Sequence, residues 1–379
     1  MKSCIFFILL IAIPSYSQTI YKTVQSVNLK ETRKFKVQLP RDFEENPDKT
    51  YPLVLVLDGD YLFEPVAGNV DYCAYWDEMP QSVVVGVNQA NFRAADNAFD
   101  EIRNVPMQSC RDFYAFLKSE LMPFLVENYR INDFKIIVAQ GISANLANIF
   151  LINDPEMFDA FINLSPIFTP NMKQNILAPL KLIEDKKWYY VAMASQDWDA
   201  VKRNVEGFDV DLSLLDRPNI FYHYDVIPNQ THYSMVTDAI PNGLEAVFST
   251  YGPIDPVEYE TEVLPASSPC EYLEKKYETI KELYGWQAKL KKSDILAVSS
   301  AIEANKKWDD FKKLSKLAKK NFPETVMEDY FMARYYEENG KEKKAYRYFQ
   351  NAYPKEEVGF LTRDYLWKYI TKLKTEYGF

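Results

Sequence analysis

The sequence predicts an α/β protein with a mostly parallel central sheet, followed by an all-α domain. Short continuous apolar runs, such as residues 53–57 and 83–87, are typical of strands buried on both faces of a sheet. Segments with helical periodicity separate these runs, and strands that alternate with helices imply a parallel sheet covered on both faces. From residue 271 onward glycine is scarce and the apolar residues fall at helical spacing, which predicts the all-α domain.

The first residues have the pattern of a secretory signal. Lys2 precedes a short apolar run, residues 5–13, and the small residues Ser15 and Ser17 indicate a cleavage site. The run is too short to span a bilayer, and no other stretch approaches the ~20 apolar residues that a transmembrane helix needs. We therefore expect residues 1–17 to be a signal peptide, with no membrane span, and the mature protein to be periplasmic or secreted.

Length, charge and cysteine content limit the class of protein. With 379 residues the chain is long enough for two domains, and a formal net charge of -10 argues against nucleic acid or anionic lipid as the main partner. Beyond the signal three cysteines remain, Cys73, Cys110 and Cys270, which is too few for a disulfide framework. A bridge between Cys73 and Cys110 and burial of free thiols are both compatible with the sequence.

The elements of the first domain can be placed in chain order. Alternating residues predict paired strands between residues 20 and 40. The elements expected next are a strand at 51–57 that stops at Asp58-Gly59, a strand at 83–87, an amphipathic helix at 110–129, and a strand at 136–139.

Residues 135–152 change from a buried strand to a helix, with Ser143 at the corner. The sequence Gly141-Ile142-Ser143-Ala144-Asn145 matches the first glycine and the serine of a G-x-S-x-G nucleophile elbow, whereas Asn145 replaces the second glycine. In such an elbow a sharp, strained turn exposes the serine hydroxyl and leaves the next backbone N–H free for an oxyanion. The alternative is that Ser143 only caps the helix.

Several short segments, taken in their order along the chain, resemble the esterase D or enterochelin-esterase-like branch of the α/β-hydrolases, over residues 26–251. The matching segments are Leu57-Asp58-Gly59-Asp60, Val84 to Asn88, the helix that contains Phe113, Leu117 and Pro123, and the serine corner. The resemblance implies an α/β-hydrolase fold and acyl transfer through a serine, with siderophore, feruloyl or acetyl esters among the substrates of similar proteins. It implies a small-molecule ester substrate here.

A serine nucleophile needs a base, and the chain has only two histidines. His223 lies in an alternating strand, whereas His232 lies in a polar loop after the last strand, where α/β-hydrolases keep their base. His232 is therefore the candidate. The acid should follow the strand at 188–194, and Asp197 matches the family position best, with Asp199 as the alternative. Either aspartate could instead cap the next helix.

Further site residues follow from similarity and from position. The resemblance implies an oxyanion hole formed by the backbone N–H groups of Ala144 and Asp60, with Tyr61 as the alternative to Asp60. Tyr61, Trp198 and Tyr233 fall near predicted strand ends and are the candidate substrate-binding residues. The sequence has no HExxH motif, no phosphate-binding glycine loop and no cysteine pair at metal spacing, so it predicts no metal site and no cofactor.

The sequence after the hydrolase-like part suggests a second domain. We expect a hydrolase domain at 18–252, a proline-rich linker at 253–270 and a helical domain at 271–379. Ala318 and Ala352 lie 34 residues apart, and this register resembles the tetratricopeptide repeat at Pro323, Tyr336, Gly340, Ala345 and Phe349. Such repeats present a surface for proteins or peptides, although a packing or dimerisation appendage would show the same pattern.

Together these features predict an exported serine esterase in which Ser143 attacks the ester, His232 transfers the proton and Asp197 holds His232. The departure at Asn145 leaves a second hypothesis open, an inactive hydrolase-fold scaffold that binds protein partners through its helical repeats. A third is an acyltransferase, in which an alcohol takes the place of water.

Overall fold

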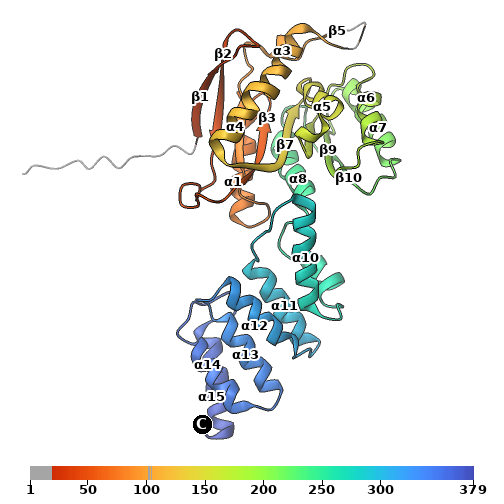
Figure 1. Ribbon diagram of the computed structural model, residues 1–379. Helices are drawn as coiled ribbons and strands as arrows, with labels where there is room; N and C mark the ends of the chain where they lie inside the picture. Colours follow the sequence, from red (N-terminus) through yellow and green to blue (C-terminus); the bar gives the residue numbers. More distant parts are fainter. Residues whose placement is uncertain (1–18, 101–102, 104) are drawn as a thin grey trace, which may run out of the picture. The chain divides into compact units, whose positions relative to one another are not determined.

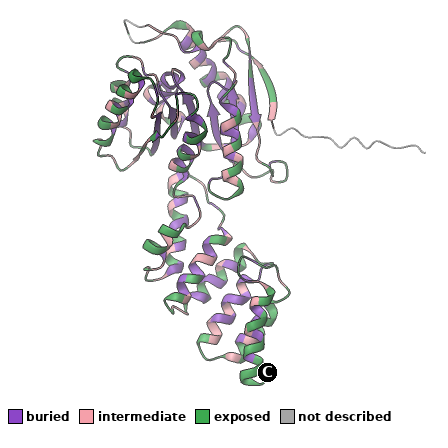
Figure 2. Ribbon diagram, turned by 180° about the vertical axis from the view of Figure 1, so that it is seen from behind, coloured by how far each residue is buried: buried purple, intermediate pink, exposed green. Residues whose placement is uncertain are grey.

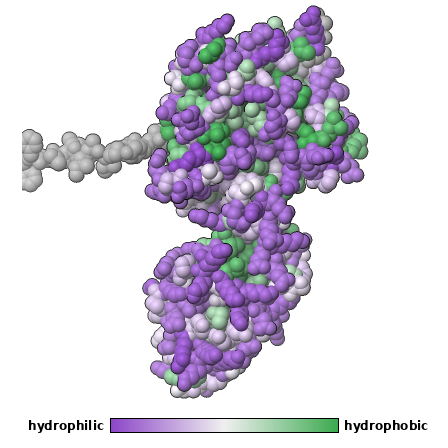
Figure 3. Space-filling view, in the orientation of Figure 1, coloured by the Kyte–Doolittle hydropathy of each residue, from purple (hydrophilic) through white to green (hydrophobic). Residues whose placement is uncertain are grey.

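The computed structural model describes residues 19–100, 103 and 105–379, so the predicted signal peptide, residues 1–17, lies outside the described residues. Contacts divide the chain into two compact units, one formed by residues up to Asp71 and Gln81–Gly243 and the other by Tyr72–Pro80 and Leu244–Phe379 (Figure 1). None of the described helices is long and apolar enough to cross a membrane. The face seen in Figure 3 is mostly hydrophilic, with scattered apolar patches.

A large sheet forms the centre of the first unit. Its strand order among the described residues is β1-β2-β4-β3-β7-β8-β9-β10. β1 and β2 run antiparallel to each other and β2 runs antiparallel to β4, whereas all neighbours from β4 to β10 are parallel. This confirms the predicted α/β class with a mostly parallel sheet. The strands are β1 (Thr19–Gln25), β2 (Thr32–Gln38), β3 (Tyr51–Val56), β4 (Val83–Val87), β7 (Ile131–Gln140), β8 (Ala160–Leu164), β9 (Lys187–Ala194) and β10 (Ile220–Ile227), with a separate short pair β5 (Phe99–Asp100) and β6 (Val105–Pro106).

Helices cover both faces of the sheet, which explains why its central strands are apolar on both sides (Figure 2). On one face a continuous core joins alternate strand residues, such as Leu55 and Ile137, to α3, α4, α5, α6 and α7. On the other face Phe63 of α1 packs against Gly86, and Gly243 of α8 lies against Ile162 and Tyr190. The bounds are α1 (Phe63–Tyr75), α2 (Arg93–Asp96), α3 (Gln108–Phe116), η1 (Leu117–Leu121), α4 (Met122–Tyr129), α5 (Ser143–Asn153), η2 (Pro155–Met157), α6 (Met172–Leu180), α7 (Asp199–Ser213) and α8 (Val236–Phe248).

The helix expected at 110–129 is not one uniform α-helix. It consists of α3, one wide π-helical turn, η1, and α4. Pro123 lies in the first turn of α4 and has no backbone N–H to donate, so the regular hydrogen-bond ladder cannot continue through it. The sequence periodicity did not reveal this irregularity.

The second unit is helical. Segment 253–270, expected as a linker, contains two helical pieces, and α10 begins at its end. Successive helices α12, α13 and α14 pack against one another, and Ala318, Ala333, Ala345 and Phe349 are fully buried between them. The assignment of these helices as tetratricopeptide repeats stays a prediction. The elements are α9 (Pro256–Glu258), η3 (Tyr259–Val263), α10 (Pro269–Tyr284), α11 (Lys292–Ala304), α12 (Asp310–Asn321), α13 (Met327–Glu338), α14 (Glu342–Ala352) and α15 (Arg363–Tyr377).

The three described cysteines, Cys73, Cys110 and Cys270, are free thiols. The bridge between Cys73 and Cys110 that the sequence allowed is therefore not formed. Burial raises the pKa of Cys110 to about 12, so this thiol behaves as a small apolar core residue.

Candidate active site

Polar side chains from six neighbouring strands of the large sheet gather at the carboxyl edge of that sheet. In an open parallel sheet this edge is where ligands bind, because the loops that follow the strands meet there. The residues concerned are Asp58 after β3, Gln89 and Arg93 after β4, Ser143 after β7, Ser165 after β8, Asp197 after β9 and His232 after β10.

The turn between β7 and α5 places Ser143 at the first residue of the helix. Its left-handed residue is Gly141, with φ 61°, a conformation that glycine adopts without steric cost, and Ser143 does not have a positive φ. A side chain at Gly141 would also approach the Nε2 atom of His232 to 3.5 Å. Ser143 does not cap α5, since no side-chain cap bond is present and the N-cap position is Ile142.

Asn145, the departure from the elbow motif, is accommodated by hydrogen bonds. Its amide group donates to the carbonyl oxygens of Ile142 and Ile167, at 2.9 and 2.8 Å, and its Oδ1 atom accepts from the backbone N–H of Thr169 at 2.9 Å. The side chain is fully buried. It therefore ties the elbow to the loop after β8, a function that a glycine could not perform.

Asp197 and His232 form a buried pair. The Nδ1 atom of His232 lies 3.0 Å from Oδ1 of Asp197. The same Oδ1 accepts from the Trp198 backbone N–H, and Oδ2 accepts from the Ser165 hydroxyl. Burial acts to raise the pKa of Asp197, but the hydrogen bonds from His232, Ser165 and Trp198 outweigh it and hold that pKa below its usual value. The Gln140 side chain donates to the His232 carbonyl at 2.8 Å. The imidazole is thus fixed, with Nε2 toward Gly141.

The two alternatives left open by the sequence have other surroundings. The side chain of Asp199 is 80% exposed and pairs with Lys202 at 3.3 Å, at the start of α7. His223, on β10, is 55% exposed at its side chain and lies 3.2 Å from Asp225. Both side chains are exposed and pair with residues outside the cavity lining, so the geometry favours Asp197 and His232.

A cavity of about 290 Å³ opens beside this pair. The three residues expected to bind substrate, Tyr61, Trp198 and Tyr233, all line it. The Trp198 ring stacks on the His232 imidazole, with 4.3 Å between ring centroids and 13° between planes, and Tyr233 meets the same imidazole edge-on. The remaining lining residues are Arg93, Gln140, Gly141, Ile142, Ile167 and His232.

The Ser143 hydroxyl is directed toward Asp58, which sequence reasoning did not place in the site. Its Oγ atom donates to Oδ2 of Asp58 at 2.6 Å, and among the described residues no hydrogen bond joins it to His232. Arg93 binds both oxygens of the same carboxylate, Nε to Oδ1 at 2.8 Å and Nη2 to Oδ2 at 3.0 Å. The Tyr61 hydroxyl lies 3.2 Å from Oδ2. Asp58 therefore connects the serine to the cavity wall.

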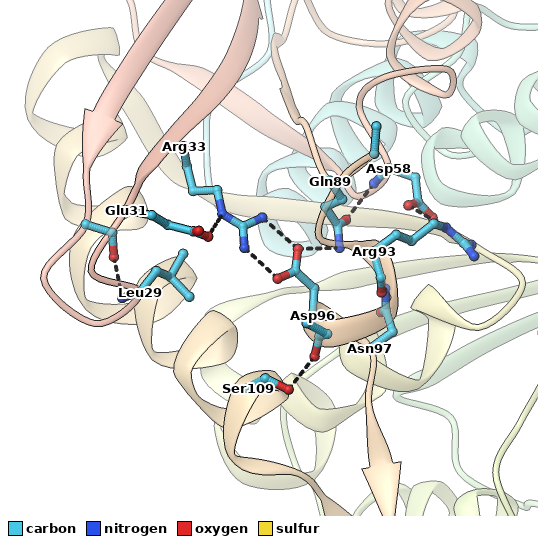
Figure 4. Close-up of polar contacts among 12 residues, drawn as sticks. Leu29, Glu31, Arg33, Asp58, Gln89, Arg93, Asp96, Asn97 and Ser109 are labelled. Atoms are coloured by element: carbon cyan, nitrogen blue, oxygen red, sulfur yellow. Dashed lines mark hydrogen bonds and ion pairs between the residues drawn. The ribbon is translucent and has the colours of Figure 1, made fainter.

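A polar network behind Asp58 fixes its position (Figure 4). The side-chain oxygen of Gln89 accepts from the Asp58 backbone N–H at 2.8 Å, and its amide donates to Asp96 at 3.3 Å. Asp96 in turn forms a bidentate pair with the buried Arg33, with both N–O distances at 2.7 Å. Bidentate arginine–carboxylate pairs are geometrically specific, so this network anchors the end of β3.

The two backbone N–H groups expected to form the oxyanion hole, those of Ala144 and Asp60, differ in their hydrogen bonds. The backbone N–H of Ala144 donates to the Gly141 carbonyl at a long 3.3 Å. Near Asp60, the N–H groups of Gly59, Tyr61 and Leu62 all donate to backbone carbonyls, whereas that of Asp60 has no hydrogen bond in the described part of the chain. The Asp60 carboxylate points away, to the N–H groups of Gln89 and Ala90, at 2.6 and 2.8 Å. A free N–H at this edge is what an oxyanion would bind.

Throughout the described ranges, no group of three or more histidine, cysteine, aspartate or glutamate residues is arranged to hold a metal ion.

Comparison with known proteins gives a family and a fold. Residues 26–220 match the family model Esterase, described as "Putative esterase". An uncharacterised protein from Capnocytophaga ochracea is similar over 94% of this chain and 100% of its own, with 28% identity and a TM-score of 0.78. An IroE-like serine hydrolase from Shewanella oneidensis is similar over 79% and 98%, with 18% identity and a TM-score of 0.62.

A more distant similarity extends to the siderophore hydrolase EstA from Aspergillus nidulans, over 64% of this chain and 98% of that one, with 14% identity and a TM-score of 0.51. At these low identities the hydrolases show a shared fold, and the family match confirms the resemblance that the sequence motifs indicated. No curated protein matches the sequence.

Proposed function

Since this chain belongs to the esterase family and is a carboxylic ester hydrolase, we propose that it is an exported serine esterase with Ser143, His232 and Asp197 as its catalytic triad. The observation that carries the proposal is the buried Asp197–His232 pair, whose free ring nitrogen faces the turn that bears Ser143. The signal pattern at residues 1–17 supports export.

The proposed reaction has two halves. Ser143 Oγ attacks the ester carbonyl carbon while its proton passes to Nε2 of His232, and Asp197 stabilises the imidazolium that forms. The carbonyl C–O single bond then breaks, and the alcohol leaves with the proton from His232. Water attacks the resulting acyl-enzyme with His232 as its base, which releases the acid and restores Ser143.

The negative oxygen of each tetrahedral intermediate would be bound by the backbone N–H groups of Asp60 and Ala144. The unbonded N–H of Asp60 supports this role, and loss of one donor of this kind costs about 3 to 4 kcal/mol of barrier in well-studied hydrolases. The Ala144 N–H would have to exchange its long bond to Gly141 for the oxyanion.

The cavity indicates which part of a substrate this site would hold. Three aromatic side chains, Tyr61, Trp198 and Tyr233, offer flat apolar surface, and Arg93 adds one cationic group. We propose a small ester of the siderophore, feruloyl or acetyl kind, in which an aromatic or short acyl group lies against these rings.

Hydrolysis of p-nitrophenyl acetate and butyrate by the full chain tests the proposal. We expect wild type to release p-nitrophenol, and Ser143→Ala to lose about 10⁴-fold or more in kcat/KM. Equal rates for the two proteins would overturn the assignment of Ser143. Absence of activity in both, with short and aromatic esters alike, would favour the inactive scaffold.

A further inference from the structure

The Ser143 hydroxyl donates its hydrogen bond to Asp58, which is not the proposed base. Its 2.6 Å bond to the Asp58 carboxylate has the length of a charge-assisted hydrogen bond, which is roughly twice as strong as a neutral one. A nucleophile in this state does not share its proton with His232. Each catalytic cycle must therefore begin by breaking the bond to Asp58.

We propose that Asp58 is a positioning residue that holds the Ser143 hydroxyl in a resting orientation, away from His232, until a ligand enters the cavity. The inference rests on the proposed role of Ser143 as nucleophile. We expect the release to be a change of the serine χ1 rotamer, since Oγ can move between staggered positions while the backbone stays fixed.

The Asp58 carboxylate is already engaged by other donors, since Arg93 binds both of its oxygens. Oδ2 also accepts from three donors at once, Ser143, Arg93 and Tyr61. His232, whose Nδ1 donates to Asp197, keeps a free Nε2 and remains the base.

The position of Asp58 is imposed by the fold. Its backbone is left-handed, with φ 53°, a conformation that residues with side chains rarely adopt. The bond from its N–H to Gln89, supported by Asp96 and Arg33, holds it there (Figure 4). Backbone strain that is maintained by surrounding contacts is typical of functional sites, and here it directs the carboxylate at the serine.

The cavity supplies the means of release. Tyr61 and Arg93 both contact Asp58 and both line the cavity, whereas Ser143 is fully buried. A ligand that enters the cavity therefore meets the two side chains that hold Asp58 before it reaches the serine. We expect a ligand that displaces these side chains to move the Asp58 carboxylate away from Ser143, which frees the hydroxyl for His232.

Nitrogen-15 NMR of the ligand-free full chain tests the resting orientation, because only two histidines contribute signals and His223 serves as the internal reference. In wild type we expect Ser143→Ala to leave the Nε2 signal of His232 almost unmoved. In the Asp58→Asn background the same serine change should shift that signal, since the hydroxyl then bonds to His232. A clear shift of the His232 Nε2 signal between wild type and Ser143→Ala would overturn the inference. This comparison needs no substitution at Asp58.

A second experiment measures the reactivity of the serine with a small fluorophosphonate. We expect Asp58→Asn to be labelled roughly tenfold faster than wild type, the factor that corresponds to loss of one charge-assisted hydrogen bond. Asp58→Asn combined with Arg93→Gln, which keeps the pair uncharged overall, should show the same direction. Glu64→Gln serves as the control, because it removes a negative charge from an α1 side chain that is 56% exposed. This variant should be labelled at the wild-type rate. Slower or unchanged labelling of both Asp58 variants would contradict the proposal.

The two experiments separate this inference from the proposed function. If no variant is labelled at Ser143, the proposed esterase mechanism fails, yet the NMR comparison still decides whether Asp58 holds the hydroxyl. If labelling is rapid in wild type and Ser143→Ala shifts the His232 signal there, the mechanism stands and the holding role of Asp58 is lost.

Discussion

The two units of this protein each contain a buried polar network, and the networks differ in what they bond to. In the helical unit, Asp294 accepts from the Tyr277 hydroxyl at 2.9 Å and from the backbone N–H of Ile254 at 2.9 Å. Tyr277 accepts in turn from the backbone of Lys291 at 2.8 Å. Burial lowers the pKa of Lys291 to about 8 and raises that of Tyr277. These groups bond to one another and to backbone that starts or joins helices.

At the carboxyl edge of the sheet the buried groups converge on a cavity. Asp197 pairs with His232, and Asp58 pairs with Arg93 and accepts from the Ser143 hydroxyl. His232 and Arg93 both line the cavity. A shifted pKa is common to both networks and therefore does not identify a site by itself. Our proposal of a site rests instead on the cavity that His232 and Arg93 line and on the bond between Asp58 and Ser143.

The largest expected effect falls on the base. We predict that His232→Gln lowers kcat/KM for a p-nitrophenyl ester about 10⁴-fold or more, because the proposed base for the serine proton is lost. His223→Gln is the matched control and should retain wild-type activity, since His223 lies on the exposed side of β10. A comparable loss in both variants would show that the two histidines are not distinguished as the structure indicates.

The acid should come next. Asp197→Asn is expected to lower kcat about 10²- to 10⁴-fold with little change in KM, since an amide cannot stabilise the imidazolium. Asp199→Asn should change kcat less than twofold, because this exposed side chain pairs only with Lys202. Steady-state kinetics of the two variants check this. Greater loss at Asp199 would reverse the assignment of the acid.

A smaller effect, on stability alone, is expected in the helical unit. Asp294→Asn should lower the free energy of unfolding by about 1 to 3 kcal/mol, because a charged acceptor for Tyr277 and Ile254 is lost. Ester hydrolysis by the folded protein should stay within twofold of wild type. Denaturant unfolding and kinetics measure the two quantities, with the exposed Asp309→Asn as control. A large loss of activity without loss of stability would contradict the contrast between the two networks.

The smallest effect is a pH dependence of stability that comes from Asp197. Its pKa is lower in the folded protein than its ordinary value of about 3.9, so the carboxylate stabilises the fold above that pH, and the contribution disappears as pH falls through the lowered pKa. The stability difference between wild type and Asp197→Asn should therefore be constant near neutral pH and shrink below about pH 4. Urea unfolding at several pH values tests this. A difference that grows on acidification would show the opposite sign of the shift.

The sequence alone indicated much of the fold and part of the site, for physical reasons. Apolar runs long enough for strands and helical periodicity between them are local signals, and they predicted the sheet and the helices. Ser143, Asp197 and His232 could be proposed because their order along the chain matches a known family order, and because the chain offers only two histidines.

The rest of the site depends on contacts that no local pattern encodes. Asp58 and Arg93 meet because β3 and β4 are neighbours in the sheet, although the two residues lie 35 positions apart. Asp58 has a left-handed backbone that directs its carboxylate at Ser143. The sequence indicated only that Asp58 belongs to a turn. Asn145 seemed a defect in the elbow, and its three hydrogen bonds became visible only with the loop after β8 in place.

We propose that Ser143 is the nucleophile of this esterase. Mass spectrometry of the full chain after reaction with a fluorophosphonate, followed by proteolysis to locate the adduct, tests this assignment. We predict one adduct, on the peptide that contains Ser143, and no adduct in Ser143→Ala. An adduct on another residue, such as Ser165, or unchanged labelling of Ser143→Ala, would contradict it.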